Sequence, residues 1–464
     1  MKKAIKDLFL YFIAGGLSRL FPILILPYIA QKLTQTEFGV FSLFQLYLSL
    51  ISVLILLGVD QAIFRKIPAI KDDKQKNEII GAVLYFILCL SVLLTILFLL
   101  FDTQFNQWMF EGNLFHPMWI VIGFSMITSV DVILTTKLKA EKRTIFYFNL
   151  MLIRSLSFLA LIIILLELGL KLDAYFIALF ISEIIMLLFI SKDIKDGIKA
   201  GFSVKLFKQL VYYGLPLSGV GFVLLLIYQF DHYLIKELFG VEMTGNYAFA
   251  YKFSAIIGTI ILIANNVWQQ RLFEKGEELA ISYMKEYAGL MIVICIGSLL
   301  FIISVFNLFS QVLIPDGFIK ILLLIQILGI GFTFYGHSQI LDSLILQRNN
   351  TFILFIFNLM VLIINIVLNM IFLPLYGLIA AAVISALSYF LLWLFVIIYL
   401  KVHCRQLKLI SMTIEFTICI TPLVINLIFD TLFISWLLFL LVCILLVYKN
   451  RKIISQIKTI YAFD

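Results

Sequence analysis

Charged residues are scarce in this chain of 464 residues: Asp, Glu, Lys and Arg together make up 13% of it. Hydrophobic residues make up 63%, including 45 phenylalanines, and the mean hydropathy is +1.10. So few charges cannot cover a surface that faces water on every side, which excludes a water-soluble globule of this length. The chain is therefore predicted to be an integral membrane protein.

The sequence is also poor in the residues that build catalytic and metal sites. Its five cysteines form no C-x-x-C pair, and its four histidines lie in separate segments. It contains no Gly-rich phosphate loop, no H-E-x-x-H motif and no nucleophile elbow. We therefore predict no catalytic residue, no metal site, no cofactor and no disulfide framework.

Long apolar runs are what the chain has in abundance. A helix needs about 20 mainly apolar residues to cross the hydrocarbon layer, and such runs recur from Leu8 to Tyr448. The pattern predicts an all-α, polytopic membrane protein with about fourteen transmembrane helices. Their approximate limits are 8–30, 38–64, 79–101, 117–136, 148–168, 172–191, 209–230, 244–270, 285–308, 319–346, 352–373, 376–400, 409–429 and 432–448.

The distribution of Lys and Arg predicts the orientation. With the N-terminus inside, 28 of the 35 basic residues fall in segments that face the cytoplasm, and only four fall in outside loops. Basic residues accumulate in cytoplasmic loops, so both termini are predicted to be cytoplasmic. This distribution explains the net charge of +8 without a nucleic-acid partner, and it favours contact with anionic membrane lipids.

A weak internal repeat appears when the sequence is shifted by 206 residues. The shift aligns Gly39 with Gly245 near the outer end of spans two and eight, and Arg65 with Arg271 at their cytoplasmic end. Six spans separate the equivalent segments, so both halves enter the membrane in the same orientation. We predict two six-helix lobes around a central cavity, at 1–200 and 201–402, followed by two further helices and a basic tail at 403–464.

The outside loops are short, which bears on the choice between a transporter and an enzyme. The longest loop, near residues 102–116, contains only Asp102 and Glu111 as acids. A membrane glycosyltransferase or polymerase usually holds catalytic acids or long substrate-binding segments outside the bilayer. We therefore predict a transporter and keep the membrane enzyme as the alternative from a different class.

Two stretches resemble polysaccharide exporters of the Wzx type, the O-antigen flippases. "LQRNNTFILFIFN" (Leu346 to Asn358) with "NIVLNMIFLPLYGLIAAAVISALSY" (Asn365 to Tyr389) is similar to their eleventh and twelfth helices, and "LTQTEFGVFSL" (Leu33 to Leu43) to their first outside loop and second helix. The resemblance implies the fold of the multidrug/oligosaccharidyl-lipid/polysaccharide (MOP) superfamily. It also implies export of undecaprenyl-diphosphate-linked oligosaccharide from the cytoplasmic to the outer leaflet of a bacterial cytoplasmic (inner) membrane. A polysaccharide polymerase and a chain-length regulator are the expected partners.

Three cations within predicted spans are the candidate ligands of the diphosphate. Arg19 lies roughly 18 Å into span one, where an arginine costs about 2.5 to 3.5 kcal/mol unless it faces a cavity or a partner. Lys252 shares one face of span eight with small and polar residues. Arg154 lies near the cytoplasmic end of span five and either faces the cavity or snorkels to the interface. The alternative for Arg19 is a structural ion pair with Glu183.

Two further sets of residues complete the candidate site. The polar side chains that could contact sugars, or else bond between helices, are Asn266, Gln339, Asn358, Asn365 and Asn369. The acids that could couple transport to a proton or sodium ion are Glu183, Asp60, Asp131 and Asp342.

Two transporters of the same fold remain as alternatives. A lipid II flippase would share the fourteen spans and a cationic cavity. A multidrug exporter for cationic drugs would favour an acidic cavity, whereas the central charges predicted here are basic. Span one also lacks the buried aspartate that is expected of proton-coupled multidrug relatives.

Overall fold

The computed structural model describes residues 25–114, 119–275, 277–309, 321–348, 350–404, 409–429 and 431–449, together with Pro22. Helices account for nearly all of these residues, and no strand occurs in the described ranges. The described residues up to Ala248 form one compact unit, and those from Phe249 onward form a second. The prediction of an all-α membrane fold is confirmed, while the predicted lobe boundaries stay a prediction.

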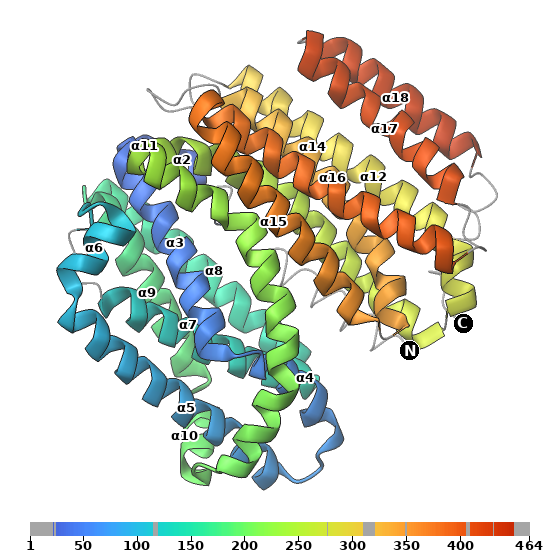
Figure 1. Cartoon of the computed structure of the whole chain (residues 1–464). Helices are drawn as coiled ribbons and strands as arrows, with labels where there is room; N and C mark the ends of the chain where they lie inside the picture. The colour runs from blue at the N-terminus through green and yellow to red at the C-terminus, as the bar shows by residue number, and fades with distance from the viewer. Residues whose placement is uncertain are drawn as a thin grey trace. The chain divides into compact units, whose positions relative to one another are not determined.

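The first unit is built from helices that return through short turns. Its elements are α2 (Leu26–Lys32), α3 (Gln35–Leu56), α4 (Val59–Lys66), η1 (Ile67–Ala69), α5 (Asp73–Leu100), α6 (Asp102–Phe110), α7 (Trp119–Ala140), α8 (Thr144–Glu167), α9 (Lys171–Phe189), α10 (Ser191–Ala200) and the first part of α11 (Val204–Lys275). Helix α7 packs against α3, α4 and α5, and α8 packs against α9 (Figure 1).

In the part of the second unit that the structure describes, six helices follow the rest of α11. These are α12 (Glu277–Leu308), α14 (Ile321–Gln347), α15 (Thr351–Tyr376), α16 (Leu378–His403), α17 (Leu409–Phe429) and α18 (Leu432–Lys449). Helix α16 packs between α14 and α15, and the last two helices pack against each other and against α12.

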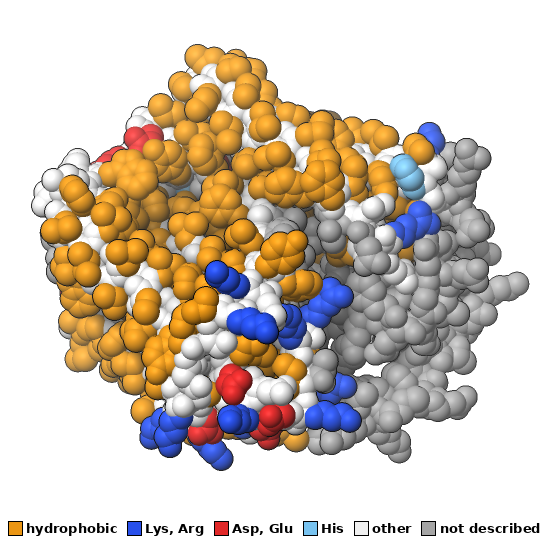
Figure 2. Space-filling model, turned by 60° about the horizontal axis from the view of Figure 1, so that its bottom comes forward, with side chains coloured by type: hydrophobic (Ala, Val, Ile, Leu, Met, Phe, Trp, Pro, Cys, Tyr) orange, Lys and Arg blue, Asp and Glu red, His pale blue; other side chains and the backbone are white. Residues whose placement is uncertain are grey.

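The surface of the described helices is that of a membrane protein. Among the described residues, nine helices are long and apolar enough to span a bilayer, and the apolar parts described in α17 and α18 are shorter. Figure 2 shows hydrophobic side chains over most of one face, with Lys, Arg, Asp and Glu gathered toward its lower edge. Large exposed side chains such as Leu93 and Leu100 on α5 are suited to lipid contact. The total of fourteen spans stays a prediction.

The motif around Thr34 begins α3 through its own hydrogen bonds. The Thr34 hydroxyl accepts from the Glu37 backbone N–H at 3.2 Å, and the Glu37 carboxylate accepts from the Thr34 N–H at 2.8 Å. This capping box satisfies two backbone donors that a helix start leaves without partners. The "LTQTEFG" stretch therefore fixes where the second span begins.

The structure differs from the predicted boundaries in three places. Span two, expected at 38–64, is divided because Leu57 and Gly58 adopt left-handed conformations between α3 and α4. Spans seven and eight are joined into the single helix α11, interrupted only by the kink at Gly240. The loop near 102–116 contains α6. Left-handed residues and kinks depend on local contacts, which a count of apolar residues does not detect.

Gly39 on α3 and Gly245 on α11 form a reciprocal close contact within the first unit. A Cβ at Gly39 would collide with the Val241 carbonyl oxygen, and a Cβ at Gly245 would collide with the Gln35 carbonyl oxygen. The shift of 206 residues maps one of these contacts onto the other, since it pairs Gly39 with Gly245 and Gln35 with Val241. The two aligned glycines are thus explained by backbone-to-backbone packing, which excludes a side chain at either position.

The first prediction concerns this contact. Gly39→Ala should destabilise the protein by about 1–3 kcal/mol, because the added methyl meets backbone atoms that cannot rotate away. Thermal unfolding in detergent measures the effect. Gly123→Ala is the matched control, because Gly123 lies within α7 and a Cβ there would meet nothing within 4 Å. Equal unfolding temperatures for the two variants would contradict the tight crossing.

Candidate functional site

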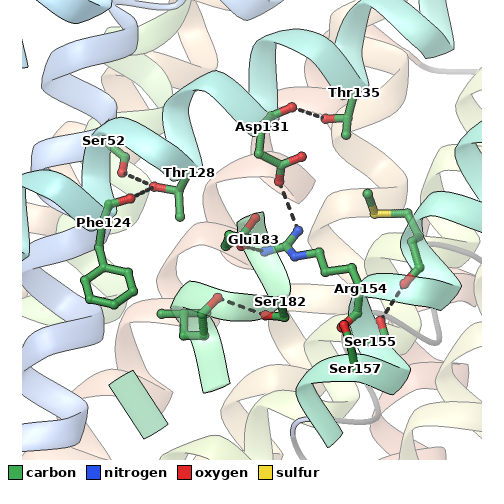
Figure 3. Close-up of polar contacts among 12 residues, drawn as sticks. Ser52, Phe124, Thr128, Asp131, Thr135, Arg154, Ser155, Ser157, Ser182 and Glu183 are labelled. Carbon is green, nitrogen blue, oxygen red and sulfur yellow. Dashed lines mark hydrogen bonds and ion pairs between the residues drawn. The ribbon is translucent and has the colours of Figure 1, made fainter. Parts of the chain in front are cut away.

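A buried ion cluster lies among α7, α8 and α9 of the first unit (Figure 3). Arg154 donates through Nη1 to Asp131 Oδ2 at 3.0 Å and through Nη2 to Glu183 Oε1. The side chains of Asp131 and Glu183 are 8% and 0% exposed, and that of Arg154 is 27% exposed. One guanidinium therefore bridges two carboxylates on neighbouring helices, using its planar fork of donors.

The turns between these helices bring the three residues to one depth. Arg154 is ten residues from the start of α8, roughly 15 Å along it. Lys142 adopts a left-handed conformation in the turn between α7 and α8, and Gly169 and Lys171 do so between α8 and α9. Such turns reverse the chain tightly, so the three helices run antiparallel with the acids on both sides of the arginine.

The two carboxylates of the cluster do not have a hydrogen-bond donor for every oxygen among the described residues. Asp131 Oδ1 and Glu183 Oε2 are buried and have no hydrogen-bond donor among the described residues. The nearby serines Ser155 and Ser182 donate to carbonyl oxygens of their own helices instead (Figure 3). With both acids ionised, the cluster has one net negative charge in a region that disfavours charge.

This geometry assigns Glu183 a different partner from the one considered in the sequence. Arg154, treated there as a cavity cation or a snorkelling side chain, is the residue that pairs with Glu183 and Asp131. Arg19 lies outside the described residues. The sequence contained a usable signal: an arginine and two acids in consecutive apolar spans are each too costly to bury alone, so they pair.

Lys252 lies on α11 in the second unit, on the face opposite two contacts between α11 and α14. On the opposite face, Ser254 Oγ donates to the Ile325 carbonyl at 3.1 Å and Ile261 packs against Gly336. At 100° per residue these two positions are roughly 180° away from Lys252. Lys252, Ala255 and Thr259 share the other face and are half-buried.

The polar residues predicted on α14 and α15 are held in local contacts. Gln339 Nε2 donates to Asp342 Oδ2 at 3.1 Å, and Asp342 Oδ1 is buried without a donor among the described residues. Asn365 Nδ2 donates to Ser388 Oγ on α16 at 2.9 Å, which is the interhelical bond considered as the alternative to sugar contact. Asn369 Nδ2 donates to Asn365 Oδ1 at 3.1 Å.

The remaining predicted residues fall elsewhere. Asn358 Nδ2 donates to the Leu354 carbonyl at 2.7 Å. Asp60 is on α4 and accepts from Gln61 Nε2 at 2.9 Å. The side chain of Asn266 lies outside the described part of the chain. No metal-binding group of three or more His, Cys, Asp or Glu residues occurs among the described residues.

Glu111, one of the two acids in the longest outside loop, has a structural contact. Its carboxylate accepts from the Val241 backbone N–H at 3.3 Å, just after the Gly240 kink in α11. A carboxylate at the N-terminal end of a helical segment satisfies an unpaired donor and opposes the helix dipole. Nearby, Lys236 donates to the Trp108 carbonyl, which fastens α6 to α11.

Comparison with known proteins places this architecture. A solved structure of the lipid II flippase MurJ in an inward closed conformation matches with a TM-score of 0.65 and 16% identity, covering 97% of this chain and 100% of that one. An inward-facing multidrug resistance MATE family transporter of the MOP superfamily matches with a TM-score of 0.61 and 15% identity, covering 88% and 95%. The fold is therefore that of MOP superfamily membrane proteins.

Residues 4–269 match the family described as polysaccharide biosynthesis protein, and the chain belongs to that family. It is also 23% identical over 441 residues to an uncharacterized membrane protein of Methanocaldococcus jannaschii, covering 86% of this chain and 84% of the archaeal protein. The family model thus confirms membership of a polysaccharide biosynthesis family, and the solved structures confirm the predicted fold.

The second prediction tests the ion cluster. Arg154→Gln should lower the free energy of unfolding by about 3–5 kcal/mol, because it leaves two buried carboxylates without a cation. Arg143→Gln is the control, since Arg143 is 41% exposed and its pair with Asp193 at 3.4 Å contributes below about 1 kcal/mol. Thermal unfolding in lipid nanodiscs measures both. Similar stability losses would show that Arg154 is not the central ion of the cluster.

Proposed function

We propose that the protein is a flippase that moves polyprenyl-diphosphate-linked oligosaccharide from the cytoplasmic to the outer leaflet by alternating access, for the synthesis of O-antigen or another surface polysaccharide. Membership of the polysaccharide biosynthesis family and the MOP fold support a transporter of glycan precursors rather than an enzyme. In this proposal both termini face the cytoplasm, and undecaprenyl diphosphate is the lipid carrier.

The face of α11 that contains Lys252, Ala255 and Thr259 is the observation that favours an anionic substrate. A membrane helix that faced lipid with Lys252, Ala255 and Thr259 would lose hydrophobic contact and leave a charge in hydrocarbon. This face is turned away from the packing against α14, so we assign it to the substrate path. A lysine there stabilises a diphosphate, whereas cationic drugs would be repelled.

Arg19 is the second cation of the proposal, because it is predicted to lie deep within span one. An arginine suits a diphosphate because its planar fork of donors matches phosphate oxygens. The inside-negative membrane potential also favours outward movement: two negative charges crossing the full field gain roughly 4 to 5 kcal/mol at 100 mV. The glycan would cross beside these cations while the polyprenyl tail stays in lipid.

Deletion of the gene is the direct test of the flippase. Completed lipid-linked repeat units should accumulate on the cytoplasmic leaflet, because assembly continues while export stops. Extraction of the lipid-linked glycans, with a membrane-impermeant probe for their sidedness, measures this. Unpolymerised units that already face outward would point to a polymerase. Rescue of a lipid II flippase deletion, without rescue of the glycan defect, would instead assign lipid II.

A further prediction concerns the positive charge at Lys252, and the same analysis of lipid-linked glycans measures it. Lys252→Gln should abolish most export at normal membrane abundance, while Lys252→Arg should retain it, because the diphosphate needs positive charge more than a particular shape. Arg19→Lys should retain part of the export and Arg19→Gln little. Full export by Lys252→Gln would remove this residue from the substrate path.

A further inference from the structure

The Asp131–Arg154–Glu183 cluster has room for one positive charge that the described side chains do not supply. Two carboxylates face one guanidinium, and each carboxylate keeps one buried oxygen without a donor among the described residues. Two like charges that share one cation in a low-dielectric region cannot both stay ionised at small cost. Addition of a single cation removes the net charge.

Among the described residues, no further cation forms an ion pair with Asp131 or Glu183. Lys139 on α7 acts electrostatically on Asp131, and Tyr147 on α8 acts on Arg154. Tyr175 on α9 faces Arg154 and Glu183, and its hydroxyl accepts from Gln45 Nε2 of α3 at 2.8 Å. Asp60 on α4, which packs against α7, is a further acid that Lys139 faces.

A proton fits this site better than a metal ion. A sodium ion needs several oxygen ligands, and here Arg154 already occupies one oxygen of each carboxylate and would repel a second cation. A proton requires only one carboxylate oxygen and converts it into a hydrogen-bond donor. The Arg154 side chain is 27% exposed, so the neighbouring helices do not enclose the cluster completely.

We propose that Asp131 and Glu183 share one exchangeable proton beside Arg154, and that this cluster couples export to a proton gradient. The coupling rests on the proposed flippase function, whereas the binding of the proton does not. With the proton bound the cluster is neutral, and without it the cluster has one net negative charge. Thr128 lies one turn from Asp131 on α7, and its hydroxyl forms a hydrogen bond with the Ser52 hydroxyl of α3 at 3.2 Å (Figure 3).

Proton counting on the purified full chain in lipid nanodiscs tests the site without any substrate. Between mildly alkaline and mildly acidic buffer, Asp131→Asn and Glu183→Gln should each take up about one proton fewer than the wild type. The double variant should also lose about one, not two, because the two acids share a single proton. Asp73→Asn is the control, since that acid is 87% exposed, and it should match the wild type.

The outcomes separate clearly. Unchanged proton uptake in both single variants overturns the site, and a loss of two protons in the double variant overturns the sharing. Arg154→Gln, if it folds, should take up about one proton more, because two acids then lack a cation. Infrared difference spectra of the same samples should show a protonated carboxyl band that is stronger in the wild type than in either single variant.

Proteoliposomes that contain lipid-linked glycan test the coupling. Wild-type flipping should respond to an imposed pH gradient, and Glu183→Gln should still flip but no longer respond. Wild-type flipping that ignores the gradient overturns the coupling while the titration still reports the proton site. An absence of flipping at all voltages and gradients contradicts the proposed function instead, and the titration is unaffected by that result.

Discussion

Hydrocarbon offers no hydrogen-bond partner and little solvation for charge, and the rest of the structure follows from this constraint. Backbone groups must bond within their own segment, so the apolar runs become helices. Each buried charge must find a partner or a wet path, so Arg154 lies between Asp131 and Glu183, while Lys252 lies on a face with small and polar neighbours. The same physical rule thus produces both the architecture and the candidate sites.

The two compact units use charge in different ways. In the first unit, opposite charges are brought together, and the excess of one carboxylate over the described cations is the basis of the proposed proton site. In the second unit, Lys252 is placed on a face away from the α14 packing, which suits an anion that must pass rather than stay. A transporter needs both kinds of site, since one binds the substrate and the other links its movement to an energy source.

Close helix packing supplies rigid parts of the first unit. The reciprocal contact of Gly39 and Gly245 brings two backbones together where any side chain would collide. The capping box at Thr34 fixes the start of α3 one turn before that contact. The Glu111 carboxylate does the same for α11 after Gly240, so the acid considered for catalysis has a structural role at a helix end.

The sequence by itself determined the helical membrane class, most span limits and the family resemblance, because these depend on runs of apolar residues and on local motifs. It also singled out Arg154 as a cavity cation or a snorkelling side chain, and Asp131 and Glu183 as acids that could couple transport to an ion. Only the tertiary structure decided that they join one another, that Asn365 bonds to Ser388, and that Gly39 meets α11. These pairings join residues on different helices, and the physical reason is that a periodic pattern fixes the face of one helix but not which neighbour that face meets.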